Sequence, residues 1–92
     1  MKIAFEKRAF DDFTEWATVN KKVHKRILTL IRDILRQPYA GIGKPESLKH
    51  ELQGYWSRRI NDEHRLLYKV EDGTLIIIAC KYHYYLRQRS RT

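Results

Sequence analysis

The sequence has few of the residues that small proteins use as covalent or conformational supports. It contains one cysteine in 92 residues, Cys80, so no disulfide can form within the chain. It also has only two prolines and four glycines, and it contains no internal repeat. A chain of this length forms one domain and depends on its own hydrophobic core. The single cysteine agrees with a reducing compartment, and we expect the protein to be cytoplasmic.

Long hydrophobic runs and common site motifs are missing as well. The longest apolar run, Leu75 to Cys80, is too short to span a bilayer, and the first residues lack the pattern of a signal peptide. No glycine-rich phosphate loop and no Gly-x-Ser-x-Gly motif is present. His24 and His50 have no partner at ligand spacing. We therefore expect no membrane partner, no metal and no cofactor.

Positive charge is in clear excess. Nineteen Lys and Arg against eleven Asp and Glu give a net charge of +8. Such a charge raises the local concentration of polyanions and speeds encounter with them. Because no basic amphipathic helix with a strong free apolar face is evident, nucleic acid and acidic proteins are the expected partners.

Hydrophobic periodicity predicts an α+β protein. Met1 to Phe5 alternates as a short strand, Phe10 to Ala17 has helical spacing, and a second helix begins at its N-cap Asn20 and ends at Pro38. Asp72-Gly73 is a strong hairpin signal, which with other short connections predicts an antiparallel meander. The four strands of this meander are predicted at Leu48 to Leu52, Tyr55 to Asn61, Arg65 to Val70 and Leu75 to Tyr84. We expect a twisted antiparallel sheet of about five strands, with the two N-terminal helices packed on one face.

Strand alternation predicts which side chains share a face of this sheet. Leu66 and Tyr68 belong with the core, and Trp56 shares its parity with Ile60. The opposite face is then lined by Ser57, Arg59, Arg65, Lys69, Lys81 and His83. Glu46 enters this face from the loop before the first meander strand. A bulge at 82–84 would exchange the faces there.

These residue types match what RNA cleavage requires. A base must take the proton of the 2′-hydroxyl, an acid must protonate the leaving 5′-oxygen, and cations must stabilise the phosphate. Glu46 is the sole carboxylate of its basic segment and is the candidate base. His83 is the natural acid at neutral pH, and Arg65 suits a bidentate phosphate clamp. Arg59 and Lys49 add positive field.

Each of these residues also has a structural interpretation. A glutamate in a lysine-rich loop is usually a solvated ion-pair partner, and a histidine near the chain end is usually structural or exposed. The run Ser57-Arg58-Arg59 is typical of a solvated strand edge, whereas Trp56 and Tyr68 are typical of a core. Tyr84 fits equally a core aromatic or a platform for a splayed nucleotide. Cys80 is expected to be a buried small hydrophobe.

Four segments, taken in order, closely resemble the YoeB (Txe/YoeB) toxins of the RelE superfamily. They are Gly43 to His50, Gly54 to Ile60, Glu63 to Tyr68 and Cys80 to Tyr84. The resemblance runs from Met1 to about Tyr84, so we expect residues 1–84 to form a single RelE/YoeB-like toxin domain. Residues 85–92, a short basic tail, depart from the family pattern.

The resemblance implies a microbial-ribonuclease-like fold and a metal-independent endoribonuclease, an mRNA interferase that cuts mRNA in the ribosomal A site. It also implies a cognate antitoxin of the YefM type and a homodimer. The catalytic residues of the family match Glu46, Arg65 and His83, and its substrate-binding positions match Lys49, Arg59 and Tyr84.

Two other functions fit the same basic surface. One is a non-catalytic RNA- or ribosome-binding module, which acts only through salt-sensitive phosphate contacts. The other is a dedicated receptor for a disordered acidic protein segment, which charge would steer to the basic face.

Overall fold

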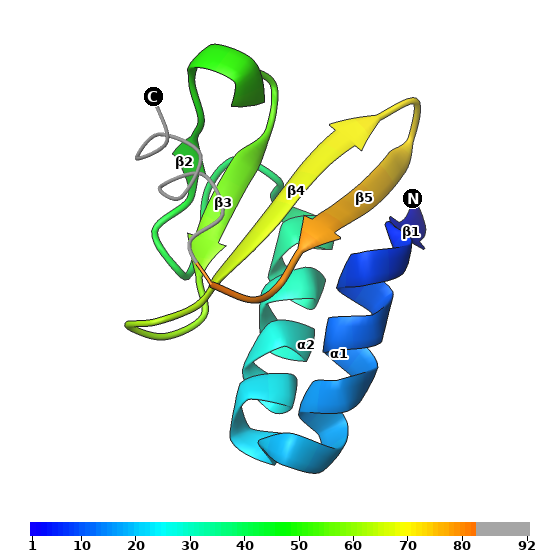
Figure 1. The fold of residues 1–92 in the computed structure, drawn as a ribbon. Helices are drawn as coiled ribbons and strands as arrows, with labels where there is room; N and C mark the ends of the chain where they lie inside the picture. The colour runs from blue at the N-terminus through cyan, green and yellow to red at the C-terminus, as the bar shows by residue number, and fades with distance from the viewer. Residues whose placement is uncertain (83–92) are drawn as a thin grey trace.

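The computed structural model describes residues 1–82, in which two helices form a layer against one face of a sheet (Figure 1). No helix in this part of the chain is long and apolar enough to cross a membrane. The elements are β1 (Lys2–Phe5), α1 (Lys7–Val19), α2 (Lys21–Arg36), β2 (Glu46–Ser47), the 3₁₀ turn η1 (His50–Leu52), β3 (Trp56–Arg59), β4 (Arg65–Glu71) and β5 (Thr74–Ala79).

The second helix follows directly from its sequence. The Asn20 side chain accepts a hydrogen bond from the backbone N–H of Val23 at 3.2 Å, which confirms the predicted N-cap. The helix ends at Arg36, two residues before Pro38, as the proline predicts. Its buried apolar residues form a single stripe against the sheet, namely Val23, Ile27, Leu30, Ile31 and Ile34.

The sheet has the strand order β1-β5-β4-β3-β2. Strands β2 to β5 pair antiparallel, which confirms the predicted meander. Strand β1 pairs parallel with β5, so the five-stranded sheet is mixed. The two helices separate β1 from the meander in sequence, and a strand joined by a long connection is not held to a hairpin orientation.

The strand predicted over 48–52 is wrong over its whole length, because strand β2 lies just before it. The ladder with β3 covers only Glu46 and Ser47, and the chain then turns through η1. His50 has a φ of 60°, a left-handed conformation that cannot continue an extended strand. The Leu48 N–H still bonds to the Tyr55 carbonyl at 2.9 Å, which closes the excursion.

The last strand is also shorter than predicted, because β5 ends at Ala79 rather than at Tyr84. Leu67 lies opposite Ala79 and Tyr68 lies opposite Ile77, so Ile78 is an extra residue on β5. This bulge lies earlier in the chain than the 82–84 position considered from sequence, and it shifts the alternation of the residues that follow.

Apolar side chains pack on both faces of the sheet. Leu66 and Tyr68 are fully buried on the helix side, within the main core. Leu67 points to the opposite face, where it forms a smaller cluster with Leu48 and Ala79. The predicted alternation of β4 is therefore confirmed, and the sheet face away from the helices has a small hydrophobic cluster of its own.

Candidate active site

Three neighbouring strands bring Glu46, Ser57 and Arg65 together on the sheet face away from the helices. Glu46 lies opposite Ser57 in the β2–β3 ladder. The Nε of Arg65, on β4, donates a hydrogen bond to the Ser57 hydroxyl at 3.1 Å. The Nη2 of Arg65 lies 3.7 Å from Oε1 of Glu46. A carboxylate and a guanidinium are thus held side by side on the face that strand alternation predicted for both.

The loop before Glu46 is fixed by a short backbone contact. The Gly43 carbonyl accepts a hydrogen bond from the Arg59 N–H at 2.7 Å. Gly43 has a φ of 78°, and a Cβ at this position would lie 2.8 Å from the Leu30 side chain. Glycine is therefore required where the loop passes between α2 and β3 on its way to Glu46.

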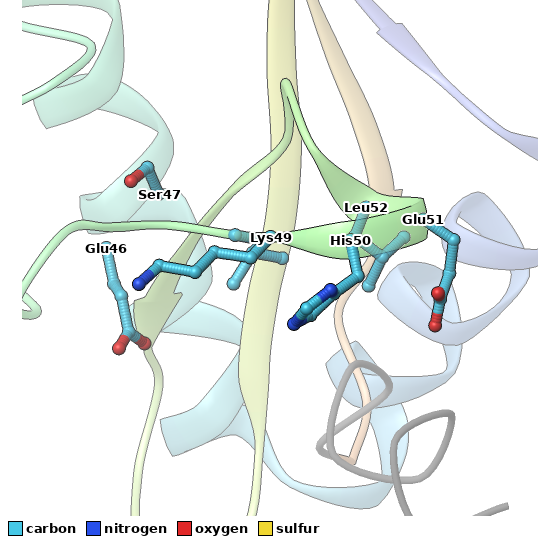
Figure 2. A pocket seen from close by; sticks show the side chains of 7 residues that line it. Glu46, Ser47, Lys49, His50, Glu51 and Leu52 are labelled. Carbon is cyan, nitrogen blue, oxygen red and sulfur yellow. The ribbon is translucent and has the colours of Figure 1, made fainter. Parts of the chain in front are cut away.

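Lys49 lies next to Glu46 along the same pocket. The pocket has a volume of about 320 Å³ and is lined by Glu46, Ser47, Leu48, Lys49, His50, Glu51 and Leu52. Figure 2 shows the Lys49 side chain extending toward the part of the pocket that Glu46 occupies. Glu46 is 56% exposed, whereas Arg65 is only 13% exposed. The carboxylate therefore remains accessible, while the guanidinium is held against the sheet.

Arg59 lies beside this group, since it pairs with Arg65 in the β3–β4 ladder. Its guanidinium is 42% exposed and forms an ion pair with Asp62 in the following turn. The structure therefore places Arg59 on the predicted face, at its edge, with a carboxylate beside it.

Lys81 does not line this face, contrary to the expectation from alternation. Its Nζ lies 3.8 Å from Glu15 of α1 and 5.9 Å from the centre of the Trp16 ring. The bulge at Ile78 and the end of β5 at Ala79 turn the chain toward α1 before Lys81. Lys81 therefore belongs to the helix side of the molecule.

The candidate acid His83 and the candidate platform Tyr84 lie outside the described residues. The backbone up to Tyr82 is firmly held. The Nδ1 of His64, a 5% exposed residue, accepts a hydrogen bond from the Tyr82 N–H at 2.8 Å. The Arg65 N–H donates to the Tyr82 carbonyl at 3.2 Å, and the Trp16 indole donates to the Cys80 carbonyl at 3.1 Å. Tyr82 is thus fixed next to Arg65, a role of His64 that sequence analysis did not identify.

Arg58 is the largest departure from the sequence analysis. It is fully buried on the helix side, not part of a solvated edge, and donates to Asp33 of α2 at 2.6 Å. It also donates to Tyr68 Oη and to the carbonyl oxygens of Gln37, Ala40 and Ile42. One signal was present in the sequence, because Arg58 shares its strand parity with the core residues Trp56 and Ile60.

The pKa values of two buried side chains, Asp33 and Cys80, indicate structural rather than chemical roles. The hydrogen bond from Arg58, followed by that from the Ile42 N–H, lowers the pKa of Asp33 to about 2. Burial raises the pKa of the Cys80 thiol to about 12, so this thiol is not a nucleophile at neutral pH. Residues 1–82 contain no cluster of three or more His, Cys, Asp or Glu side chains that would hold a metal ion.

Comparisons with known proteins place this geometry in context. Residues 5–84 match the family model described as the YoeB-like toxin of bacterial type II toxin–antitoxin systems. A curated relative, the toxin YoeB of Streptomyces coelicolor, is 52% identical over 84 residues, which cover 91% of this chain and all of the relative. The solved YoeB/ParE toxin from Agrobacterium tumefaciens is 42% identical, with a TM-score of 0.89, and covers 91% of this chain and all of that one.

Structures from Staphylococcus aureus are similar as well. One is a YoeB dimer at 48% identity, and another is a YoeB–YefM complex at 49% identity. Both have a TM-score of 0.85 and cover 91% of this chain and 98% of theirs.

Proposed function

The chain belongs to the YoeB-like toxins of bacterial type II toxin–antitoxin systems, and on this premise we propose that it is a ribosome-dependent endoribonuclease. Its substrate is mRNA in the ribosomal A site, and its cleavage stops translation. The observation that carries the proposal is the placement of Glu46 beside Arg65 on one accessible sheet face, with Ser57 orienting the guanidinium.

In the proposed reaction, Glu46 accepts the proton of a ribose 2′-hydroxyl, and the 2′-oxygen attacks the adjacent phosphorus. Arg65 stabilises the charge that develops on the equatorial phosphate oxygens, for which its planar guanidinium is suited. The bond to the 5′-oxygen breaks, and His83 donates a proton to that oxygen. The products are a 2′,3′-cyclic phosphate and a free 5′-hydroxyl. The step needs only the base, the acid and the cation named above, and no oxidation state changes.

The surrounding residues serve the same reaction. Lys49 contributes positive charge beside Glu46, and Arg59 contributes it at the edge of the face. Tyr84 is proposed to position a nucleotide by stacking.

The proposed partners come from the relatives. The Staphylococcus aureus YoeB is described as a dimer and in complex with YefM. We propose a YefM-type antitoxin and a homodimer for this chain, whose charge of +8 favours capture of an acidic antitoxin segment.

Cleavage of translated mRNA, located by toe-printing, tests the assignment. We expect Glu46→Ala, Arg65→Ala and His83→Ala each to lower the cleavage rate by about two orders of magnitude or more. Glu51→Ala is the matched control, because Glu51 lines the same pocket but lies at the opposite end from Glu46 (Figure 2), and it should change the rate by less than about threefold.

Two outcomes would overturn the proposal. If all three variants cut as well as the parent, the site is wrong. If the parent binds ribosomes tightly in a salt-sensitive manner but releases no cleaved product, the protein is a binding module instead.

A further inference from the structure

We infer that the outer face of α2 is a second RNA-binding surface, which takes the phosphate backbone of double-helical RNA. This α2 basic face consists of Lys21, Lys22, Lys25, Arg32 and Arg36, all of them exposed. The inference goes beyond the proposed cleavage reaction and does not depend on it.

The position of these cations follows from helical geometry. The buried stripe of α2, which includes Ile27 and Ile34, faces the sheet, and the α2 basic face lies on the opposite side of the helix. From Lys21 to Arg36 the helix rises about 22 Å, enough to follow several phosphates. The Glu46–Arg65 site lies on the far side of the sheet from the helices, so both surfaces can be occupied together.

The charge of α2 contrasts with that of its neighbour. Helix α2 carries six Lys and Arg residues and one carboxylate, Asp33, which is turned inward to Arg58. Helix α1 carries two cations and three carboxylates, and its Lys7 pairs with Asp11 at 2.8 Å. Within residues 1–82, no carboxylate lies within 4.0 Å of Lys25 or Arg32. Lys25 and Arg32 are therefore not compensated by the fold, whereas Arg36 pairs with Asp33 at 3.2 Å.

This distribution opposes helix formation, which argues that it serves binding. Lys21 and Lys22 occupy the first turn, where the helix dipole disfavours cations. Lys21 with Lys25, and Arg32 with Arg36, are like charges four residues apart, which repel each other. A polyanion laid along the helix would relieve both effects at once.

The composition of the α2 basic face selects among polyanions. Besides its cations, Thr29 is the only exposed residue of α2, and the apolar side chains of the helix are buried or, like Leu28, half-buried. A membrane surface or a protein partner would require apolar anchors beside the charge. Phosphate contacts require only cations at suitable spacing, and double-helical RNA offers a regular array of phosphates.

The test measures binding of a fluorescent, blunt-ended 20-base-pair RNA duplex to the full chain across a salt titration. The variant Lys21→Gln/Lys25→Gln/Arg32→Gln removes three charges from the α2 basic face. The control Lys2→Gln/Lys7→Gln/Arg8→Gln removes the same net charge from exposed positions on β1 and α1. We expect the α2 variant to lose about tenfold or more in affinity near 0.1 M salt, and its log–log salt slope to be smaller by about 2 to 3.

The remaining measurements distinguish RNA binding by α2 from a fold defect and from a simple effect of net charge. The α2 variant should melt at or above the temperature of the parent, so weaker binding will not reflect unfolding. Glu46→Ala should bind the duplex like the parent even though we expect it to lower cleavage by about two orders of magnitude, so failure of this inference can be told apart from failure of the proposed function. Equal losses in the α2 variant and the control would overturn the inference, because only net charge would then matter. If the parent protein does not bind the duplex but binds poly-glutamate through these residues, the inference is overturned in favour of an acidic protein partner.

Discussion

Arg58 and Arg65 come from neighbouring strands, and each lies beside a carboxylate, but they point to opposite faces of the sheet. Arg58 is fully buried on the helix side, 2.6 Å from Asp33. Arg65 lies on the other face, 3.7 Å from Glu46, which is more than half exposed. The Nε of Arg58 donates a hydrogen bond to the Tyr68 hydroxyl, and the Nε of Arg65 donates one to the Ser57 hydroxyl.

The comparison shows that an arginine beside a carboxylate can serve either stability or a site, depending on how the carboxylate is held. Asp33 accepts hydrogen bonds from Arg58, Arg36, Gln37 and the Ile42 N–H, and its pKa is lowered chiefly by the bond from Arg58 and then by that from the Ile42 N–H. A carboxylate held in this way stabilises the fold but is a poor proton acceptor. Glu46 lies beyond hydrogen-bond distance of the Arg65 guanidinium and faces solvent, which suits a group that must meet a substrate.

The largest effect should come from truncating each arginine to leucine. Arg58→Leu removes the buried charge partner of Asp33, leaving only the exposed Arg36 as a cation beside it, and removes the donor from three loop carbonyls. We expect it to lower the free energy of unfolding by about 3 to 5 kcal/mol in urea titrations. Arg65→Leu should lower it by less than about 1 kcal/mol, while cleavage of translated mRNA falls by about two orders of magnitude.

A double variant shows whether the buried charge causes the loss. Arg58→Leu/Asp33→Leu removes both charges and should be more stable than Arg58→Leu alone. If the single and double variants unfold at the same urea concentration, the loop carbonyls rather than Asp33 account for the effect. Equal stability losses for Arg58→Leu and Arg65→Leu would contradict the comparison.

The two arginines also show which features the sequence predicts. Alternation placed Ser57, Arg59 and Arg65 on one face because short meander strands keep their register locally. The same alternation assigned Arg58 to the core side, but composition favoured a solvated run, since the partner that permits its burial lies 25 residues away. Lys81 was misplaced because a bulge depends on the packing of a neighbouring strand.

Features of α2 and of the segment near Tyr82 show the same difference between what nearby residues determine and what distant residues determine. The cap at Asn20 and the buried stripe of α2 follow from residues within one or two turns, and both were predicted. The contact between His64 and Tyr82 spans 18 residues and has no periodic signature. The role of His83 as acid stays a prediction.

A smaller effect on the free energy of unfolding should appear at acid pH, and it should come from the buried Arg58–Asp33 pair. The pKa of Asp33 is lowered in the folded state, so its contribution to stability is complete above about pH 4 and is lost as the pH falls toward 2. Asp33→Asn should therefore be less stable than the parent at pH 7, and the difference in unfolding free energy should narrow between pH 4 and pH 2. Urea titrations at each pH measure this difference.

Asp11→Asn is the control for the acid experiment. Asp11 pairs with Lys7 on the exposed side of α1, where solvent screens the interaction. Its stability should follow that of the parent at every pH. A gap between Asp33→Asn and the parent that stays constant from pH 7 to pH 2 would show that the charge of Asp33 is not what stabilises the fold.

The smallest and most closely matched effect comes from removing the two hydroxyls that orient the arginines. Tyr68→Phe removes the acceptor 3.2 Å from Arg58 Nε and the donor to the Pro38 carbonyl, so unfolding free energy should fall by about 1 to 2 kcal/mol with cleavage unchanged. Ser57→Ala removes the acceptor 3.1 Å from Arg65 Nε, so cleavage should fall about fivefold to tenfold, with a stability loss below about 1 kcal/mol. Because each change deletes one oxygen beside one guanidinium, the opposite pattern of losses would show that the two arginines have been assigned to the wrong roles.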